Sequence, residues 1–256
     1  MNSAQQPLVS VLLPIFNIGH YLHESLDSLL DSSYQNIEIL AIDDFSKDDS
    51  WKVLKLYKQI DKRIKIYRNV KHYGKALTLN RLLRKAKGQY IVVMDGKDMV
   101  YKHKIKKQVT YLKKNEKATA VATQCTFINA ENRKTATSAF PLDVASIYQR
   151  PLHGISLDFE TIMIDRHRLP KDTLYFDPTS ELVYSGIIMK LLQFGEIHNL
   201  PTLLQYRRTE NPNRQTTLAD IPNLIKLWVQ SMDSYDYRPN IRALFNSFRQ
   251  PDLSTQ

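Results

Sequence analysis

Two aspartates, Asp95 and Asp98, directly follow an uninterrupted apolar run over Tyr90–Met94. A short apolar run of this kind is typical of a buried strand in a mostly parallel sheet, and open α/β sheets bind ligands beyond the carboxyl ends of such strands. Carboxylates there suit a hard divalent cation, because Mg²⁺ is commonly held by one or two carboxylates together with the phosphates of its ligand. Aspartates are also common turn formers and helix caps, so this pattern alone leaves two interpretations open.

A second pair of acids, Asp43 and Asp44, follows the apolar segment Ile37–Ile42. Strand and helix patterns alternate from residue 9 to residue 98, which predicts parallel strands joined by right-handed crossovers. Because parallel strands end on the same edge of a sheet, both acidic pairs are expected to meet there. The chain has no G-x-G-x-x-G after its first strand and no P-loop motif. We therefore expect a nucleotide diphosphate bound through a metal, and neither a dinucleotide dehydrogenase nor a P-loop enzyme.

The elements that must position these acids can be predicted along the whole chain. Strand patterns cover Val9–Leu13, Ile37–Ile42, Arg63–Tyr67, Tyr90–Met94, Thr119–Ile128, Glu160–Ile164 and His198–Tyr206. Helical patterns cover Tyr21–Leu30, Trp51–Ile60, Gly74–Ala86, Lys102–Asn115, Ser180–Phe194 and Asp220–Met232. Pro14 is expected to end the first strand, and the polar stretch ENRKTATSAFPL at 131–142 is predicted to be a loop.

The composition indicates an ordinary globular protein, with 43% hydrophobic and 24% charged residues in 256. The single cysteine, Cys125, the lack of an apolar run of about 18 residues and the lack of a signal-peptide pattern predict a cytoplasmic location. A net charge of +10, concentrated over Lys102–Lys117, favours anionic partners. That segment is either a solvated helix face or a peripheral contact with an acidic membrane. No nucleic-acid-binding motif accompanies it, so nucleic acid is not an expected partner.

Four ordered segments match a known set of motifs. VSVLLPIFN at 9–17 resembles V-S-V-I-I-P-x-Y-N, and IEILAIDDFSKDDS at 37–50 resembles E-I-I-V-V-D-D-G-S-T-D-x-S. HYGKALTLN at 72–80 resembles N-x-G-x-x-x-A-x-N, and AKGQYIVVMDGKD at 86–98 resembles G-x-Y-I-x-x-L-D-A-D-D. Over residues 8 to about 115 the chain therefore resembles the family 2 glycosyltransferases with the GT-A fold.

The resemblance implies a fold and an activity. The fold would be a GT-A type Rossmann-like α/β sandwich, with a central, mostly parallel sheet flanked by helices in a single domain over 1–256. Residues 8–115 would bind the nucleotide sugar, 116–215 the acceptor, and 216–256 would form a C-terminal helix and tail. The activity would be inverting transfer of a sugar from a nucleotide diphosphate sugar, often a UDP-sugar, to a polysaccharide, glycolipid or glycan acceptor. Mg²⁺ or Mn²⁺ would be the cofactor, and the inner face of a membrane the location.

The matched positions also imply roles for individual residues. Pro14 and Phe16 would shape the nucleoside pocket, although Phe16 could equally pack in the core. Asp44 would hydrogen-bond the base, and Asp95 would hold the metal and the ribose or diphosphate. The remaining nucleotide-binding residues at matched positions are Asn17, Lys75, Gly96 and Lys97.

The chain departs from the family at the second metal-binding acid, where it has Lys97. An ammonium cannot coordinate a cation, but it can pair with a phosphate. Two hypotheses follow. Either Asp98 substitutes, so that Asp95 and Asp98 form the metal site, or Lys97 partly replaces the metal.

The second departure concerns the general base, which the family carries in E-D-x-D-L-x-x-R-L. Val183 and Tyr184 stand where its E-D pair belongs. Glu181, two residues earlier, and Asp177 are the predicted catalytic residues, and Glu160 is a further candidate. Glu181 could instead only favour the helix dipole. These departures leave a second class of function open, namely a catalytically degenerate binding or scaffold subunit.

Overall fold

A computed structural model describes residues 6–150, 156–180 and 182–209, together with residues 222, 225, 226, 229, 253 and 254. Its helices are α1 (Gly19–Leu30), α2 (Ser50–Ile60), α3 (Lys75–Lys85), α4 (Lys104–Lys114), α5 (Val144–Gln149) and α6 (Val183–Leu191). Its strands are β1 (Val9–Ile15), β2 (Ile37–Asp43), β3 (Ile64–Arg68), β4 (Tyr90–Val93), β5 (Met99–Val100), β6 (Ala118–Ile128), β7 (Lys134–Ser138), β8 (Met163–Asp165), β9 (Glu196–Arg208) and β10 (Leu253–Ser254). Almost all of the helix predicted at 220–232 lies outside the described residues.

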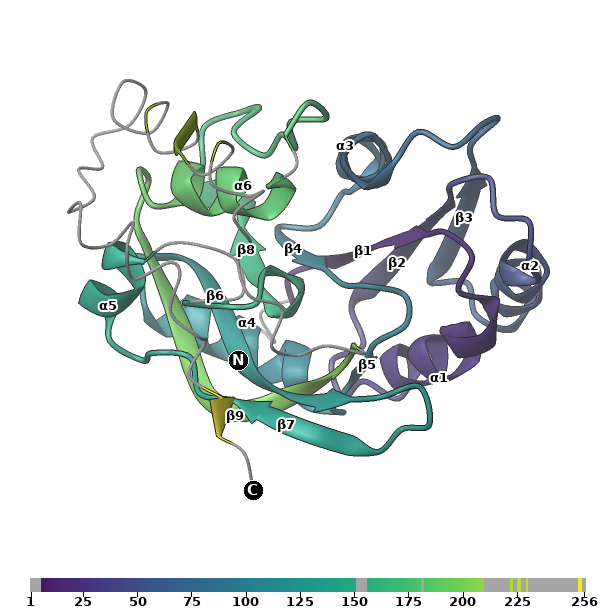
Figure 1. The fold of residues 1–256 in the computed structure, drawn as a ribbon, viewed down its shortest axis with the longest axis horizontal. Coiled ribbons are helices and arrows are strands. Elements are labelled where there is room, and N and C mark those ends of the chain that lie inside the picture. Colours follow the sequence, from purple (N-terminus) through teal and green to yellow (C-terminus); the bar gives the residue numbers. More distant parts are fainter. Residues whose placement is uncertain are drawn as a thin grey trace, which may run out of the picture.

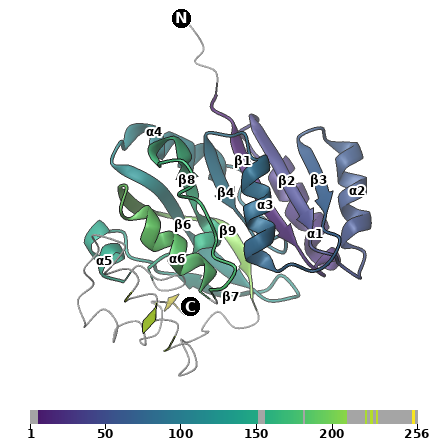
Figure 2. The ribbon, with the colours of Figure 1, turned by 90° about the horizontal axis from the view of Figure 1, so that it is seen from above.

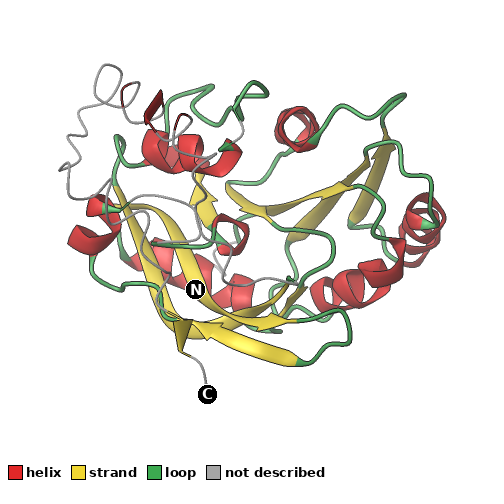
Figure 3. Cartoon of the chain, viewed as in Figure 1, coloured by secondary structure: helices red, strands yellow, loops and turns green. Residues whose placement is uncertain are grey.

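A curved mixed sheet forms the centre of the molecule, with helices on both faces (Figure 1, Figure 3). Its strand order is β10-β7-β6-β8-β4-β1-β2-β3, and β9 pairs with both β6 and β5. Strands β4, β1, β2 and β3 run parallel, side by side, as Figure 2 shows. Strand β8 is antiparallel to β4 and β6 and joins the two halves of the sheet. The predicted α/β sandwich is therefore confirmed.

Strand β1 continues through Pro14 to Ile15, so the prediction that Pro14 ends this strand was wrong. The pairing of β1 with β4 stops at Leu12 and Val93, whereas its pairing with β2 continues to Ile15 and Asp43. A proline lacks the N–H that a central strand must donate. It is tolerated here because one side of β1 is already unpaired at that point.

The alternating side chains of β1 separate two cores. Val9, Val11 and Leu13 belong to the core under α1, α2 and α4, whereas Leu12 belongs to the core under α3 and α6. This alternation follows from the two-residue repeat of a strand. Figure 1 accordingly shows α3 and α6 on one side of the sheet and α1 and α4 on the other. Both α3 and α6 therefore lie on the same face.

The second half of the chain differs from its prediction in two places. The stretch predicted as loop contains β7, which pairs antiparallel with β6 and is half exposed. The strand predicted over Glu160–Ile164 is instead a 3-10 turn at Phe159–Thr161 followed by the short strand β8. In the described part of the chain, no helix has both the length and the apolar character needed to cross a membrane.

Candidate active site

The carboxyl ends of β2 and β4 bring Asp44 and Asp95 to the same sheet edge, as the sequence pattern predicted. Helix α3 begins at this edge with Lys75, because its preceding strand, β3, is parallel to β2. The edge also receives the end of β9 and the start of α6 from the second half of the chain. The site therefore lies where the two halves meet.

Asp44 is buried and organises the loop that leads into α3. Its carboxylate accepts hydrogen bonds from the backbone N–H groups of Tyr73 (2.9 Å) and Gly74 (2.8 Å) and from Asn69 Nδ2 (2.6 Å). His72 Nδ1 lies 2.9 Å from Asp44 Oδ2. Asp44 was predicted to hydrogen-bond the base of the nucleotide. Its carboxylate instead accepts hydrogen bonds from this chain, and these bonds fix residues 72–74.

Phe16 lies on the surface next to this loop, where 42% of it is exposed. Its ring stacks on the His72 imidazole, with ring centroids 4.0 Å apart and an interplanar angle of 27°. The adjacent Asn17 has a positive φ of 51°, and its side-chain oxygen accepts from Lys47 N at 2.9 Å. Phe16 is therefore not a core residue, and an exposed aromatic pair borders the sheet edge.

Asp95 follows β4 and is the most open of the acids at this edge, with 16% of its side chain exposed. Its Oδ1 atom accepts a hydrogen bond from the backbone N–H of Lys97 at 3.2 Å. Between them, Gly96 packs so closely that a Cβ atom would lie 2.4 Å from Ile15 Cδ1 and 2.7 Å from Ile18 Cδ1. A larger residue at this position would require the ends of these two isoleucine side chains to shift.

Lys75 connects Asp95 to the second half of the chain. Its Nζ atom lies 3.5 Å from Asp95 Oδ2 and 3.0 Å from Glu160 Oε1. Glu160 also accepts a hydrogen bond from the Tyr184 hydroxyl at 2.9 Å. Lys75 Nζ lies 5.5 Å from the centre of the Tyr184 ring. The Lys75 ammonium thus lies between two acids, one from each half of the chain.

Arg207, at the end of β9, lies beneath this cluster and pairs with acids from three segments. Its Nε atom is 2.7 Å from Asp158 Oδ2, and its two terminal nitrogens contact Asp98 and Glu160. Although burial acts to lower it, the pKa of Arg207 is held well above its usual value by Asp158, Asp98 and Glu160. The guanidinium is therefore a permanent buried charge.

Asp98 is completely buried and faces β9. Its Oδ1 atom accepts from Arg208 N at 2.9 Å, and its Oδ2 atom accepts from Gln205 Nε2 at 3.0 Å and from Arg207. Burial raises the pKa of Asp98 to about 7, whereas the Arg207 guanidinium acts in the opposite direction. Both carboxylate oxygens are thus used to attach β9 to the loop after β4.

Two residues of α4 support the cluster from below. Gln108 Nε2 donates to Val121 O and Thr161 O, both at 2.9 Å, and so ties α4 to β6 and to the turn that carries Glu160. Lys104 is fully buried, and its ammonium has no hydrogen-bond partner among the described residues. Burial lowers the pKa of Lys104 to about 7 against the opposing effects of Asp98 and Asp158.

Of the two predicted catalytic acids, the structure describes only Asp177. Glu181 is outside the described residues. Asp177 is on an exposed turn, where its Oδ1 atom accepts from the N–H (2.8 Å) and hydroxyl (2.7 Å) of Thr179. These hydrogen bonds lower the pKa of Asp177. Asp158 was not predicted, because no motif marks it, and the fold brings it into the cluster.

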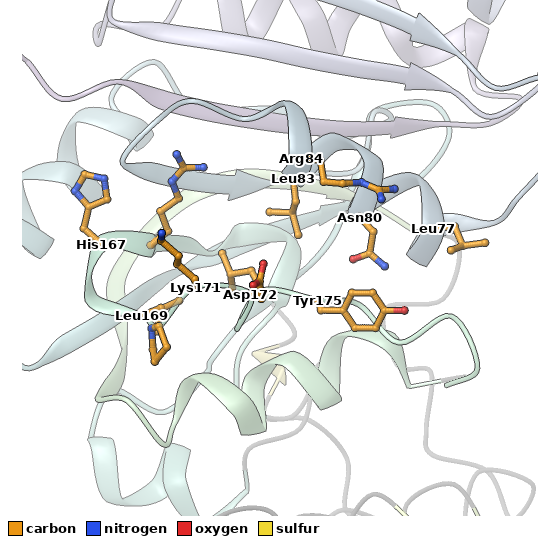
Figure 4. Close-up of a pocket in the computed structure, with 12 residues that line it drawn as sticks. Leu77, Asn80, Leu83, Arg84, His167, Leu169, Lys171, Asp172 and Tyr175 are labelled. Carbon is orange, nitrogen blue, oxygen red and sulfur yellow. The ribbon is translucent and has the colours of Figure 1, made fainter.

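A separate cavity of about 940 Å³ lies between α3 and the segment 166–175 (Figure 4). Its wall combines basic side chains, such as Arg84 and Lys171, with apolar ones, such as Leu83 and Tyr175. None of the residues predicted for nucleotide binding line it. The cavity is therefore distinct from the sheet edge that carries Asp95.

The fold and the polar sheet edge define an α/β domain of the nucleotide-sugar-binding type, and comparisons with known proteins agree. Residues 10–174 match the family model described as Glycosyl transferase family 2. The chain belongs to this family. It is 30% identical over 165 residues to an uncharacterized glycosyltransferase of Haemophilus influenzae, and 29% identical over 169 residues to the putative teichuronic acid biosynthesis glycosyltransferase TuaG of Bacillus subtilis. Each match covers 64% of this chain and 64% of the relative, just under two thirds of its length.

Solved structures show the same fold at low sequence identity. S. aureus TarS 1-349 in complex with UDP-GlcNAc aligns with a TM-score of 0.70 and 17% identity, covering 90% of this chain and 68% of that one. The mannosyltransferase PcManGT from Pyrobaculum calidifontis, in complex with GDP-Man and Mn²⁺, aligns with a TM-score of 0.68 and 17% identity, covering 95% of this chain and 69% of that one. The GT-A fold is therefore shared.

Proposed function

We propose that this chain is a glycosyltransferase that binds a nucleotide diphosphate sugar, most readily a UDP-sugar, at the sheet edge beside Asp95. The observation that carries the proposal is the position of this open acid, which lies between Lys75 and the loop holding Lys97. Family membership supports it, as do the nucleotide sugars bound by TarS and PcManGT.

Each part of the edge has a proposed role in donor binding. The base stacks beside the Phe16–His72 pair, next to Pro14 and Asn17. Asp44 serves the base indirectly, because its carboxylate holds the loop at 72–74. Lys75 and Lys97 supply positive charge to the diphosphate. Charge of this kind stabilises the leaving group, on which negative charge develops as the glycosidic bond breaks.

A divalent cation fits this edge with one protein ligand only. Asp95 presents the open carboxylate, whereas Asp98 uses both oxygens to hold β9. Among the described residues, no group of three or more histidines, cysteines or acids is arranged to bind a metal. We propose that Mg²⁺ or Mn²⁺ is held by Asp95 and the donor phosphates, which is a known arrangement for Mg²⁺. Lys97 supplies part of the positive charge that faces the donor phosphates. Asp98 does not bind the metal and instead positions β9.

The remaining proposals concern the acceptor and the location. The acceptor, a glycan or a lipid-linked glycan, would bind to the half formed by residues 116–215, and the sugar would be transferred with inversion. The outer face of α4 carries the exposed Lys106, Lys107, Lys113 and Lys114, and Lys102 and Lys117 flank it. We propose that this face contacts an acidic membrane surface, where each such residue contributes about 1 kcal/mol.

Calorimetric binding of UDP, GDP and dTDP, with and without Mn²⁺, tests the proposal. We expect UDP to bind, Asp95→Asn to weaken its binding in the presence of Mn²⁺ by at least about tenfold, and EDTA to have a smaller effect than Lys97→Ala. Asp31→Asn is the matched control, because Asp31 is an exposed acid at the far end of α1. Binding of none of the nucleotides, together with no hydrolysis of the corresponding sugars, would favour the scaffold class instead.

A further inference from the structure

Helix α6 begins with Val183 and Tyr184. Neither side chain can act as a carboxylate base, but the Tyr184 hydroxyl points to one. It donates a hydrogen bond to Glu160 Oε1 at 2.9 Å. A carboxylate is therefore present beside the start of α6, and a different segment of the chain supplies it.

Glu160 is held rigidly in this position. Its backbone N–H donates to Asp158 Oδ1 at 3.0 Å, and the neighbouring Thr161 hydroxyl donates to Asp158 O at 2.7 Å. Gln108 holds the carbonyl of Thr161 from α4. Arg207 contacts Glu160 Oε2 and leaves Oε1 facing Lys75 and Tyr184. The carboxylate is thus oriented by its surroundings, as a preorganised catalytic group must be.

We propose that Glu160 is the general base that deprotonates the acceptor in sugar transfer, an assignment that rests on the function proposed above. Glu160 and Asp95 lie on either side of Lys75, whose ammonium contacts both. The leaving diphosphate would bind at Asp95, so the base lies across the site from it. An inverting displacement needs this arrangement, because the acceptor attacks the face of the sugar opposite to the leaving group.

Lys75 provides the means to uncover the base. Its ammonium is 0.5 Å nearer to Glu160 than to Asp95, and 43% of its side chain is exposed. A bound diphosphate carries more negative charge than one carboxylate and lies on the Asp95 side. It would draw the ammonium away from Glu160 Oε1. Donor binding would therefore let the acceptor hydroxyl take the place of the ammonium at this oxygen, while the Tyr184 hydroxyl continues to hold it.

The proposed step balances as follows. The acceptor oxygen attacks the anomeric carbon while its proton passes to Glu160 Oε1, and the bond between that carbon and the diphosphate oxygen breaks. The nucleoside diphosphate leaves with the electron pair. With water as the acceptor, the products are the free sugar, the nucleoside diphosphate and a proton that Glu160 releases to solvent.

The other groups in the cluster do not suit this role. Burial and the neighbouring Glu160 hold the pKa of Tyr184 well above its usual value, so its hydroxyl remains a donor. Asp158 and Asp98 pair with Arg207, as Glu160 does, but among the described residues neither of them makes an ion pair with Lys75. Asp95 lies on the leaving-group side. Glu160 is therefore the one acid of this cluster that both faces Lys75 and lies opposite the diphosphate.

Hydrolysis of a UDP-sugar in water tests the assignment. We expect Glu160→Gln to lower kcat by at least about 100-fold, in the range of general-base catalysis, with UDP affinity changed less than threefold. Asp165→Asn is the matched variant, because Asp165 is another buried acid but pairs with Arg168 outside the cluster that holds Glu160. It should lower kcat less than tenfold. Sodium azide, a nucleophile with no proton to lose, should restore UDP release by Glu160→Gln and yield the glycosyl azide.

Three outcomes would overturn the assignment, and a fourth applies if Glu160→Gln does not fold. The first is a Glu160→Gln enzyme that binds UDP and hydrolyses the sugar at the wild-type rate. The second is an equal loss in Asp165→Asn and Glu160→Gln without azide rescue, which would indicate a structural role. If Glu160→Gln does not fold, Glu160→Asp, which keeps a carboxylate, is compared with Glu160→Ala. Activity of Glu160→Asp that is no higher than that of Glu160→Ala would then contradict the assignment of Glu160 as the base. The third is a wild-type chain that neither binds nor hydrolyses any donor, which also overturns the proposed function.

Discussion

Asp44 and Asp98 are buried aspartates at the same sheet edge, but they are built into the molecule in opposite ways. Asp44 accepts from backbone N–H groups and from Asn69, all within 30 residues of it in the sequence. Asp98 accepts from Gln205, Arg207 and Arg208, all more than 100 residues away. The first is a local loop anchor with mainly neutral donors. The second is one member of a buried ionic network.

This difference predicts how much stability each region loses when one of its residues is substituted. A loop anchored by hydrogen bonds loses about 1 kcal/mol per bond, because water replaces the lost partners. A buried network loses much more when one charge is removed, because the remaining charges are left without compensation. In the local region around Asp44, substitutions should therefore change stability little but weaken donor binding. In the distant region, the ionic network around Asp98 and Arg207, substitutions should mainly lower stability.

The largest expected effect is that of Arg207→Met, which leaves Asp98, Asp158 and Glu160 buried together without their cation. We expect the free energy of unfolding to fall by about 3–5 kcal/mol, measured by urea denaturation. Lys102→Met breaks the exposed pair with Asp31 and serves as the control, with a loss below about 1 kcal/mol. Equal losses in both variants would mean that the buried network has no special role.

Lys104→Met should act in the opposite direction. Because folding lowers the pKa of Lys104 to about 7, the unfolded chain binds an extra proton between about pH 7 and the usual lysine value of 10.5. The wild type should therefore gain stability as the pH rises through this window. The methionine variant lacks this slope and should be more stable by about 1–4 kcal/mol at pH 7, with a smaller gain at pH 9.5.

Urea denaturation at the two pH values measures the effect of Lys104→Met. Lys107→Met, at an exposed position of the same helix, should show neither the gain nor the pH dependence. A gain that stays constant between pH 7 and pH 9.5 would contradict the assignment of the slope to Lys104.

The smallest effect on stability is expected in the local region. Gly74 has φ +86° and ψ 165°, a conformation that other residues adopt only with strain, and a Cβ atom there would meet nothing within 4 Å. Gly74→Ala should therefore cost about 1 kcal/mol of stability through the backbone alone. Since Gly74 N donates to Asp44, UDP affinity should fall as well. Arg84→Ala, exposed on the same helix, is the control, and an equal loss of affinity there would refute the role of the loop.

The local region could largely be predicted from the sequence, because its apolar runs and motifs are contiguous. The strands that end at Asp43 and Val93 were each predicted to within one residue of their observed ends. The distant region could not be predicted in the same way. Lys104 belongs to a basic run that predicts a solvated face, yet the helical turn directs it under Asp98. Strand β7 was missed because its polar sequence reflects an exposed strand rather than a loop.

The candidate site shows the same division. Asp44 and Asp95 follow predicted parallel strands, so their meeting at one edge was predicted from strand order. Lys75 was expected to bind the nucleotide through its matched motif, but its contact with Asp95 was not predicted. Glu160 and Tyr184 meet across 24 residues, through a turn whose position depends on β8 pairing between β4 and β6. No local pattern encodes such a meeting.

The separation of 109 residues between Asp98 and Arg207 also has a consequence for synthesis of the chain. At roughly 5–20 residues per second, roughly 5–20 s pass on the ribosome between the two residues. Asp98, Asp158 and Glu160 all emerge before the one guanidinium that pairs with all three. Strand β9 is therefore the last described element of the site to be made. The nascent chain can complete the parallel strands β1 to β4 early, but it acquires a charge-balanced site only when β9 docks beside β6.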